Sequence, residues 1–309
     1  MRYVEVGGLR LSVIGLGTWQ FGSLEWRYGS TYASDTAPEI VRRAIELGVN
    51  LIDTAEIYGF GRSERIVGEA IRGQRDGLVI ATKLVPVMPL QVVVDWQVQG
   101  SLRRLGLEAI DLYQVHFPNP LASPRSTMAP LRTLLDKGLV RHVGVSNHSL
   151  ARWRASERAL GHPILTNQVR FSLAAPLPHW ELVPYAKEEK RVVIAYSPLG
   201  QGLLGGGHST GSAAPADIRG RSALFRPRSL RLAEPLLAAV RETAAAHAAT
   251  PAQVALAWLI GHGNVVAIPG ARTVAQLEEN VAAAELELSR VEMDRLTAEA
   301  TRFELACRR

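Results

Sequence analysis

From residue 13 onward, short apolar runs rich in β-branched residues alternate with longer stretches of helical periodicity. The apolar runs have no polar face, which is typical of parallel strands buried on both sides. Eight such strand and helix units are what a (β/α)8 barrel requires, so the sequence predicts an α/β protein with a TIM barrel. The predicted strands are 13–18, 49–55, 78–83, 110–116, 140–147, 164–171, 192–198 and 264–270, and the predicted helices are 36–48, 63–73, 92–106, 128–138, 150–161, 180–190, 234–248 and 275–285.

Three further segments surround the repeated units. Residues 1–12 predict an N-terminal β-hairpin with a Gly-Gly turn, which could plug one end of the barrel. Residues 200–234, rich in Gly, Ser and Arg, form a long loop after the seventh strand and are a candidate lid or binding loop. Residues 291–303 predict an extra C-terminal helix. No linker divides the chain, so we expect one domain over residues 1–309.

The composition of the chain argues against membrane and nucleic-acid partners. The single cysteine, Cys307, allows no intramolecular disulfide, and no apolar run approaches the roughly 18 residues of a membrane span. We therefore expect a cytoplasmic protein with no membrane partner, acting as a monomer or weak homo-oligomer. The net charge is +6, but the basic residues are spread along exposed helical positions, which favours a solvated surface over nucleic-acid binding. One cluster is a candidate anion site: Arg219, Arg221, Arg226, Arg228 and Arg231.

Several familiar site motifs are missing from the sequence. The segment GLGTWQFG has Gln20 where a dinucleotide-binding glycine motif needs its third glycine. The segment GGHSTGS lacks the lysine of a phosphate-binding P-loop. No HExxH, CxxC or EF-hand pattern occurs, so no metal is expected, and there is no GxSxG nucleophile motif.

Strong polar side chains end three successive predicted strands. Asp53 closes one strand, Lys83 the next and His116 the third, while Tyr58 follows Asp53 in its loop. In barrels of this type the active site lies at the C-terminal ends of the strands, and neighbouring strands are about 4.8 Å apart. Each residue alone is equally consistent with a helix cap, a solvated loop or a satisfied core group. Together they predict one catalytic pocket.

These residue types suit proton transfer to a carbonyl group. An ammonium at Lys83 favours the phenolate of Tyr58 and is expected to lower its pKa from the ordinary value near 10. A carboxylate at Asp53 would keep the lysine charged and in place. His116 would be a neutral orienting or polarising group, or a second proton donor. Such a phenol suits protonation of a carbonyl oxygen while a nicotinamide delivers hydride to the carbon.

The same residues belong to a set of longer motifs. DTAEIYGFGRSERIVGEAI, ATK, DLYQVHFPNP, GVSN, AYSPLGQGLL and IPGARTVAQLEENVAA resemble, in order and spacing, the signatures of the aldo-keto reductase superfamily. The resemblance covers nearly the whole chain. It implies NADPH-dependent reduction of an aldehyde or ketone to an alcohol, with Asp53, Tyr58, Lys83 and His116 as the catalytic tetrad and the tyrosine as general acid.

The resemblance also assigns a cofactor site. It implies that Ser146, Asn147 and Gln168 bind the nicotinamide carboxamide and that Tyr196 stacks on the ring. Arg272 follows Gly270 at a helix start, where unpaired N–H groups favour an anion, and it can bind the 2′-phosphate of NADPH, so NADPH is expected over NADH. The other candidate cofactor-binding residues are Gly17, Thr18, Trp19, Asp53, Ser197, Pro198, Leu199, Gln201, Gly202, Gln276, Glu279 and Asn280.

The substrate is a small carbonyl compound whose identity the sequence leaves open. Aromatic residues in the loops after the first and fourth strands predict an aromatic wall, or else aromatic packing. Many relatives have Trp and Asp where this chain has Phe117 and Asn119, so their substrate preferences do not transfer. The aromatic residues are Trp19, Phe21, Trp26, Tyr28 and Phe117, and the candidate substrate-binding residues are Trp19, Trp26, Tyr58, His116 and Phe117.

Two functions from other classes are alternatives. A Schiff-base aldolase would use Lys83 as nucleophile, although a neighbouring carboxylate would keep that lysine protonated. A redox-sensing binding module is the other, because channel β-subunits share this fold and tetrad.

Overall fold

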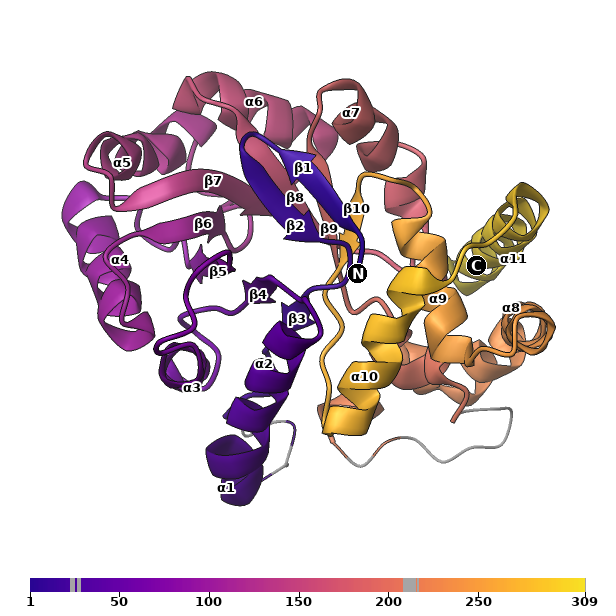
Figure 1. The fold of residues 1–309 in the computed structure, drawn as a ribbon. Coiled ribbons are helices and arrows are strands. Elements are labelled where there is room, and N and C mark those ends of the chain that lie inside the picture. Colours follow the sequence, from indigo (N-terminus) through magenta and orange to yellow (C-terminus); the bar gives the residue numbers. More distant parts are fainter. Residues whose placement is uncertain (23–25, 27–28, 208–214, 216, 309) are drawn as a thin grey trace.

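The computed structural model describes residues 1–22, 26, 29–207, 215 and 217–308. Eight parallel strands in this part of the chain form one sheet in the order β3-β4-β5-β6-β7-β8-β9-β10, surrounded by helices (Figure 1). The predicted (β/α)8 barrel is confirmed. The strands are β3 (Leu16–Gly17), β4 (Leu51–Asp53), β5 (Val79–Leu84), β6 (Ile110–Val115), β7 (Val140–Ser146), β8 (Ile164–Arg170), β9 (Val192–Tyr196) and β10 (Val265–Ala267).

The sheet closes between its first and last strands. Ile14 forms a parallel bridge with Ala267, and the Gly17 amide donates to the carbonyl of Pro269 at 3.1 Å. Glycine is required at position 17, because a Cβ there would lie 2.7 Å from the carbonyl oxygen of Ile268. The closing segment can therefore approach its neighbour only without a side chain.

Helices follow the strands and pack outside them. Several end on a residue with a left-handed conformation, as at Gly106 and Gly161, where glycine carries no steric penalty. The helices are α1 (Gly29–Thr31), α2 (Ala37–Glu46), α3 (Arg62–Ala70), α4 (Gln91–Leu105), α5 (Pro124–Asp136), α6 (Leu150–Leu160), α7 (Leu182–Glu188), α8 (Pro227–Ala246), α9 (Pro251–Ile260), α10 (Val274–Ala282) and α11 (Arg290–Arg308). A π-helical turn, η2 (Tyr32–Thr36), precedes α2, and 3-10 turns occur at η3 (Leu177–His179), η4 (Gly200–Gly205), η5 (Ile218–Arg221), η6 (Ala223–Phe225) and η7 (Ala283–Glu285).

The N-terminal hairpin lies across the end of the barrel where the strands begin (Figure 1). Its strands are β1 (Tyr3–Val6) and β2 (Leu9–Ser12), paired antiparallel as predicted. Val6 and Leu11 belong to one buried cluster with the inward-facing Leu51, Leu112 and Leu165. The hairpin is thus held by apolar burial and seals the barrel core at this end.

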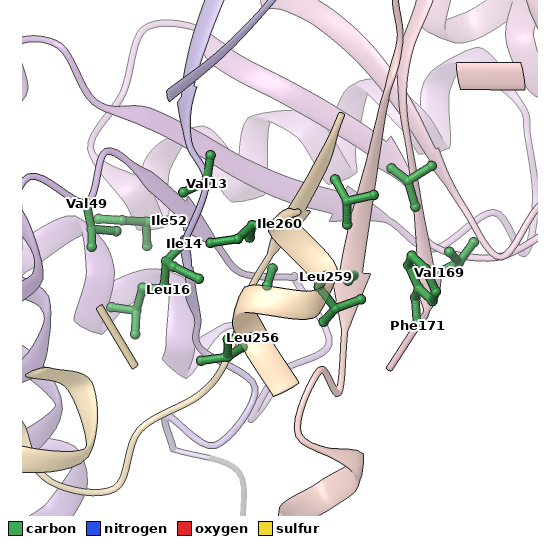
Figure 2. Close-up of a cluster of buried hydrophobic side chains, with 14 of the residues drawn as sticks. Val13, Ile14, Leu16, Val49, Ile52, Val169, Phe171, Leu256, Leu259 and Ile260 are labelled. Atoms are coloured by element: carbon green, nitrogen blue, oxygen red, sulfur yellow. The ribbon is translucent and has the colours of Figure 1, made fainter. Parts of the chain in front are cut away.

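The helix between the last two barrel strands is not the one predicted. The stretch 234–248 lies in α8, but α9 is the helix that packs against β10. Figure 2 shows Leu256 and Leu259 of α9 inside the buried cluster that also contains Ile14 and Phe171. Residues 251–260 are apolar on every face, so they lack the amphipathic period that marks a surface helix. Their one local signal is a capping box between Thr250 and Gln253.

The expected long loop at 200–234 is shorter than predicted, because α8 already begins at Pro227. The residues before it include the turns η4, η5 and η6, while 208–214 and 216 lie outside the described residues. Helix α8 packs against the predicted C-terminal helix, observed as α11, and this pair lies to one side of the barrel (Figure 1). None of the helices in the described ranges is long and apolar enough to cross a membrane.

Candidate active site

The predicted catalytic residues come together at the C-terminal ends of β4, β5 and β6. Lys83 Nζ donates to Asp53 Oδ1 at 2.5 Å and to the hydroxyl of Tyr58 at 3.3 Å. The rings of Tyr58 and His116 meet edge to face, with centroids 5.9 Å apart. Lys83 is buried beneath the pocket, whereas the largely buried Asp53 lines it together with Tyr58 and His116. The cluster therefore presents a phenol and an imidazole to a ligand above a buried ion pair.

Local contacts fix the loop that carries Tyr58. The buried hydroxyl of Ser63, in the first turn of α3, lies 2.8 Å from Thr18 Oγ1 and 2.9 Å from Thr54 Oγ1. This cluster ties the start of α3 to the ends of β3 and β4. Glu56 accepts the amide of Val85 at 2.8 Å and so joins the same loop to the end of β5.

Asp53 is held by more donors than the sequence indicated. Its Oδ2 accepts from the amide of Gln168 at 2.7 Å and from that of Gln114 at 3.1 Å. Gln114 was not among the predicted residues. It lies two positions before His116 in an apolar run, so strand alternation turns both toward the barrel interior, and that spacing was the available signal. A carboxylate that accepts from three donors is fixed in position.

The predicted direction of the Tyr58 pKa was wrong. Burial raises the pKa of the phenol above its ordinary value and outweighs the Lys83 ammonium, which lowers it. Asp53 also raises it, because the carboxylate offsets much of the ammonium's charge. Burial lowers the pKa of Lys83, but Asp53 and Tyr58 outweigh this and the pKa is raised. At neutral pH the site thus holds a protonated phenol beside a charged lysine.

His116 is a neutral side chain in this site. Burial, together with the charge of Lys83, lowers its pKa to about 3. Its Nδ1 is buried and has no hydrogen-bond partner among the residues that the structure describes. An imidazole in this state polarises or orients a ligand and does not supply positive charge.

These pKa directions predict the pH dependence of any reduction that needs the Tyr58 proton. His116 titrates far below neutral pH, so we expect no change in rate near pH 6.5. The phenol gives up its proton only above its raised pKa, so activity is complete below that value and falls as the pH rises through it. We expect kcat for reduction to stay within about twofold from about pH 6 to about pH 9. A sigmoidal loss centred near pH 6.5 would contradict this.

A pocket of about 720 Å³ opens beside the cluster. All predicted cofactor-binding residues line it, from Gly17 on β3 to Asn280 on α10. Three of them are non-glycine residues with positive φ: Asn147 at 56°, Ser197 at 50° and Gln201 at 59°. Such conformations cost about 1–3 kcal/mol each and gather at functional sites. The hydroxyl of Tyr196 donates to Asn147 Oδ1 at 3.1 Å, which fixes one of these side chains.

The far end of the pocket is built by the turn into α10. Its carbonyl at Ala271 accepts from Gln20 Nε2 at 3.1 Å and from the Tyr32 hydroxyl at 2.9 Å. Glycine at position 270 leaves room for Gln20, because a Cβ there would lie 2.6 Å from the end of that side chain and displace it. Arg272 lines the pocket directly before the start of α10. A guanidinium and the amides of a helix start thus lie together, which suits a phosphate.

The other end of the pocket is aromatic. The rings of Trp19 and Trp26 meet edge to face with centroids 5.1 Å apart, and both residues line the pocket beside Tyr58. Phe117 is adjacent to His116 but does not line the pocket, and Phe21 is fully buried in the core. Tyr28 lies outside the described residues.

The structure adds pocket residues that the sequence did not single out. One arginine of the predicted cluster, Arg219, lines the pocket. Its Nη2 lies 2.7 Å from Asp217 Oδ2, and its guanidinium lies 5.8 Å from the centroid of the Trp26 ring. The other arginines of that cluster are exposed and do not line it. The further additions are Gln20, Ile57, Gly205, Gly207, Ala252, Ile268, Pro269 and Ala271.

Comparisons with known proteins identify relatives of this chain. Residues 13–300 match the model of the aldo/keto reductase family. A Mycobacterium tuberculosis protein named as an uncharacterised oxidoreductase is 53% identical over 304 residues, covering 98% of this chain and 94% of that protein. The methylglyoxal reductase of Escherichia coli is 34% identical, covering 93% and 90%. The structure of an aldo-keto reductase from Klebsiella pneumoniae in complex with NADPH has a TM-score of 0.76 and 30% identity, covering 96% and 94%.

Proposed function

Because the chain belongs to the aldo/keto reductase family, we propose that it is an NADPH-dependent oxidoreductase that reduces an aldehyde or ketone to an alcohol. The observation that carries the proposal is the cluster at the end of the pocket, where Lys83 lies 3.3 Å from the Tyr58 hydroxyl and 2.5 Å from Asp53. The NADPH complex of the Klebsiella relative supports the choice of cofactor.

The chemistry follows from the state of each group. When bound, NADPH supplies the hydride that the carbonyl carbon accepts. Tyr58 donates its proton to the carbonyl oxygen, so the substrate gains one hydride and one proton and leaves as an alcohol. Lys83 stabilises the phenolate that remains, and Asp53 keeps the lysine charged. His116, neutral at working pH, orients the carbonyl oxygen toward the phenol.

The residues along the pocket would hold the cofactor in this proposal. Ser146, Asn147 and Gln168 would bind the nicotinamide carboxamide, and Tyr196 would stack on the ring. Gln168 is already oriented, because its Nε2 donates to Asp53 and leaves its Oε1 as an acceptor for the carboxamide. The segment from Ser197 to Gly202 would bind the diphosphate, and Gln276, Glu279 and Asn280 would contact the adenosine.

The Arg272→Ala variant tests the choice of NADPH over NADH. Removing the guanidinium leaves the 2′-phosphate without its bidentate donor, and NADH carries no such phosphate. Charged hydrogen bonds are worth about 1.5–3 kcal/mol, so we expect KM for NADPH to rise at least tenfold and KM for NADH to change less than twofold. Exposed Arg228, which does not line the pocket, provides the control Arg228→Ala. An equal rise in KM for NADPH and for NADH would contradict the assignment of Arg272 to the 2′-phosphate.

The activity itself is tested by following NADPH absorbance with a panel of aldehydes, ketones and sugars. Methylglyoxal belongs in that panel because the E. coli relative is named as its reductase. Absence of turnover with the whole panel, despite NADPH binding, would favour the redox-sensing alternative. The aldolase alternative is weakened by the raised pKa of Lys83, because a protonated amine is not a nucleophile.

A further inference from the structure

Another pocket, of about 540 Å³, lies between α3 and α4, which pack against each other at one side of the barrel (Figure 1). Both helices run antiparallel to the strands, so their C-terminal ends lie at the end of the barrel opposite the tetrad. The charged lining consists mostly of arginines from the two helices and the loop after α3. These are Arg65, Arg72, Arg75, Arg103 and Arg104, with Glu69 as the one lining carboxylate.

Two of these arginines are fixed by buried carboxylates. Arg104 Nε lies 2.6 Å from Glu64, whose side chain is fully buried, and Arg75 pairs with the buried Asp111. Asp111 is shared, because Arg141 also lies 3.2 Å from it. One carboxylate therefore serves two guanidinium groups, of which only Arg75 lines the pocket.

Glycine lets α3 and α4 pack closely together beside the pocket. A Cβ on Gly68 of α3 would lie 2.7 Å from the carbonyl oxygens of both Arg104 and Leu105. On α4, a Cβ at Gly100 would lie 3.0 Å from the guanidinium of Arg104. At Gly68 the two helices therefore meet backbone to backbone, whereas Gly100 faces the Arg104 side chain.

The remaining arginines are available to a ligand. Arg65, Arg72 and Arg103 are exposed, and in the described part of the chain none of them forms an ion pair. Basic residues near a helix C-terminus also stabilise the helix dipole, each by about 0.3–1 kcal/mol. That effect falls off within the last turn, and Arg65 lies at the fourth residue of α3, so the dipole does not account for all three.

We propose that this arginine pocket binds a small anion that carries two or more phosphate groups. Guanidinium groups bind phosphate oxygens in a planar, bidentate manner. One phosphate group has a charge of about −2 at most, whereas three guanidiniums without an ion pair to a described residue, from α3, the loop after it and α4, line this pocket. The volume lies within the range of about 300–1,000 Å³ for small-molecule sites. The site is independent of the proposed reduction, because it lies at the other end of the barrel.

Calorimetric titration with pyrophosphate tests the proposal, with NADP⁺ present at saturation so that the cofactor pocket is occupied. The variant Arg65→Gln/Arg72→Gln/Arg103→Gln leaves the two buried ion pairs intact, and we expect it to lose at least tenfold in pyrophosphate affinity. Inorganic phosphate should bind the native protein at least tenfold more weakly than pyrophosphate. The matched control removes the same charge from exposed positions outside this pocket: Arg42→Gln/Arg125→Gln/Arg158→Gln.

Three outcomes would overturn the proposal. An equal loss of pyrophosphate affinity in the control variant would mean that overall charge alone attracts the anion. A lower unfolding temperature with unchanged pyrophosphate affinity would mean that the arginines only stabilise the helices. Tighter binding of a single-stranded oligonucleotide than of pyrophosphate would point to nucleic acid. Should the triple variant not fold, the single variant Arg103→Gln replaces it, with a loss of at least threefold expected.

Discussion

Replacing Tyr58 with phenylalanine is expected to lower kcat for carbonyl reduction by about 10²–10⁴-fold, while the dissociation constant for NADPH changes less than twofold. The variant removes the hydroxyl that lies 3.3 Å from Lys83 and leaves the ring in place. Without that proton the developing alkoxide must take one from water. Stopped assays with the best aldehyde of the panel measure kcat, and fluorescence titration measures cofactor binding.

The control for this variant is Tyr3→Phe. Tyr3 lies in the N-terminal hairpin, where its hydroxyl donates to the carbonyl of Gly48 at 2.9 Å, far from the pocket. Loss of that bond should leave kcat unchanged. Retention of more than a tenth of the activity by Tyr58→Phe would show that another group supplies the proton.

Replacing Asp53 with asparagine is expected to destabilise the fold as well as the reaction. Asp53 and Lys83 have side chains that are 2% and 1% exposed, so the variant leaves a buried ammonium without its counter-charge. Removing one partner of such a pair costs about 3–5 kcal/mol of unfolding free energy. Urea unfolding monitored by circular dichroism measures the loss. The lysine's pKa should fall with it, and kcat should drop at least tenfold.

Two further variants separate the buried pair from a general charge effect. Asp53→Asn combined with Lys83→Met should be more stable than Asp53→Asn alone, because no unpaired charge remains. Asp95 forms a partly exposed pair with Lys137 at 3.2 Å, and exposed pairs contribute about 0–1 kcal/mol. Asp95→Asn is therefore the control. If Asp53→Asn lowers the unfolding free energy by no more than Asp95→Asn does, burial of the ion pair is not important for stability.

The proximity of the proposed catalytic residues could be predicted because barrel topology relates residues that are distant in sequence. Asp53, Lys83 and His116 each follow an apolar run, and parallel strands bring such ends to one edge. The sequence did not show that Gln114 donates a hydrogen bond to Asp53. Its position in the strand showed that it faces inward, but which of the inward-facing groups it would contact depends on the stagger between strands.

The helix in the last barrel unit shows a different limit. Amphipathic periodicity identifies helices that have one solvent-exposed face. Because α8 has such a pattern, the sequence predicted that it is the barrel helix of this unit. Helix α9 is surrounded by β10, α8 and α10 and is buried along almost its whole length. A helix that is buried on all sides shows no alternation of apolar and polar residues in its sequence. Only the tertiary packing therefore reveals which helix covers the sheet.

The order of apolar and helical segments, by itself, determined the barrel, and the residues that end its strands determined where we propose that the reaction takes place. The tertiary structure alone decided the state of those residues, including the direction of the Tyr58 pKa, and it alone brought Arg219 to the pocket and the arginines of α3 and α4 around a common cavity. The reason is physical. Periodicity is a local property of the chain, whereas desolvation and charge pairing depend on which distant groups the fold places within a few ångströms.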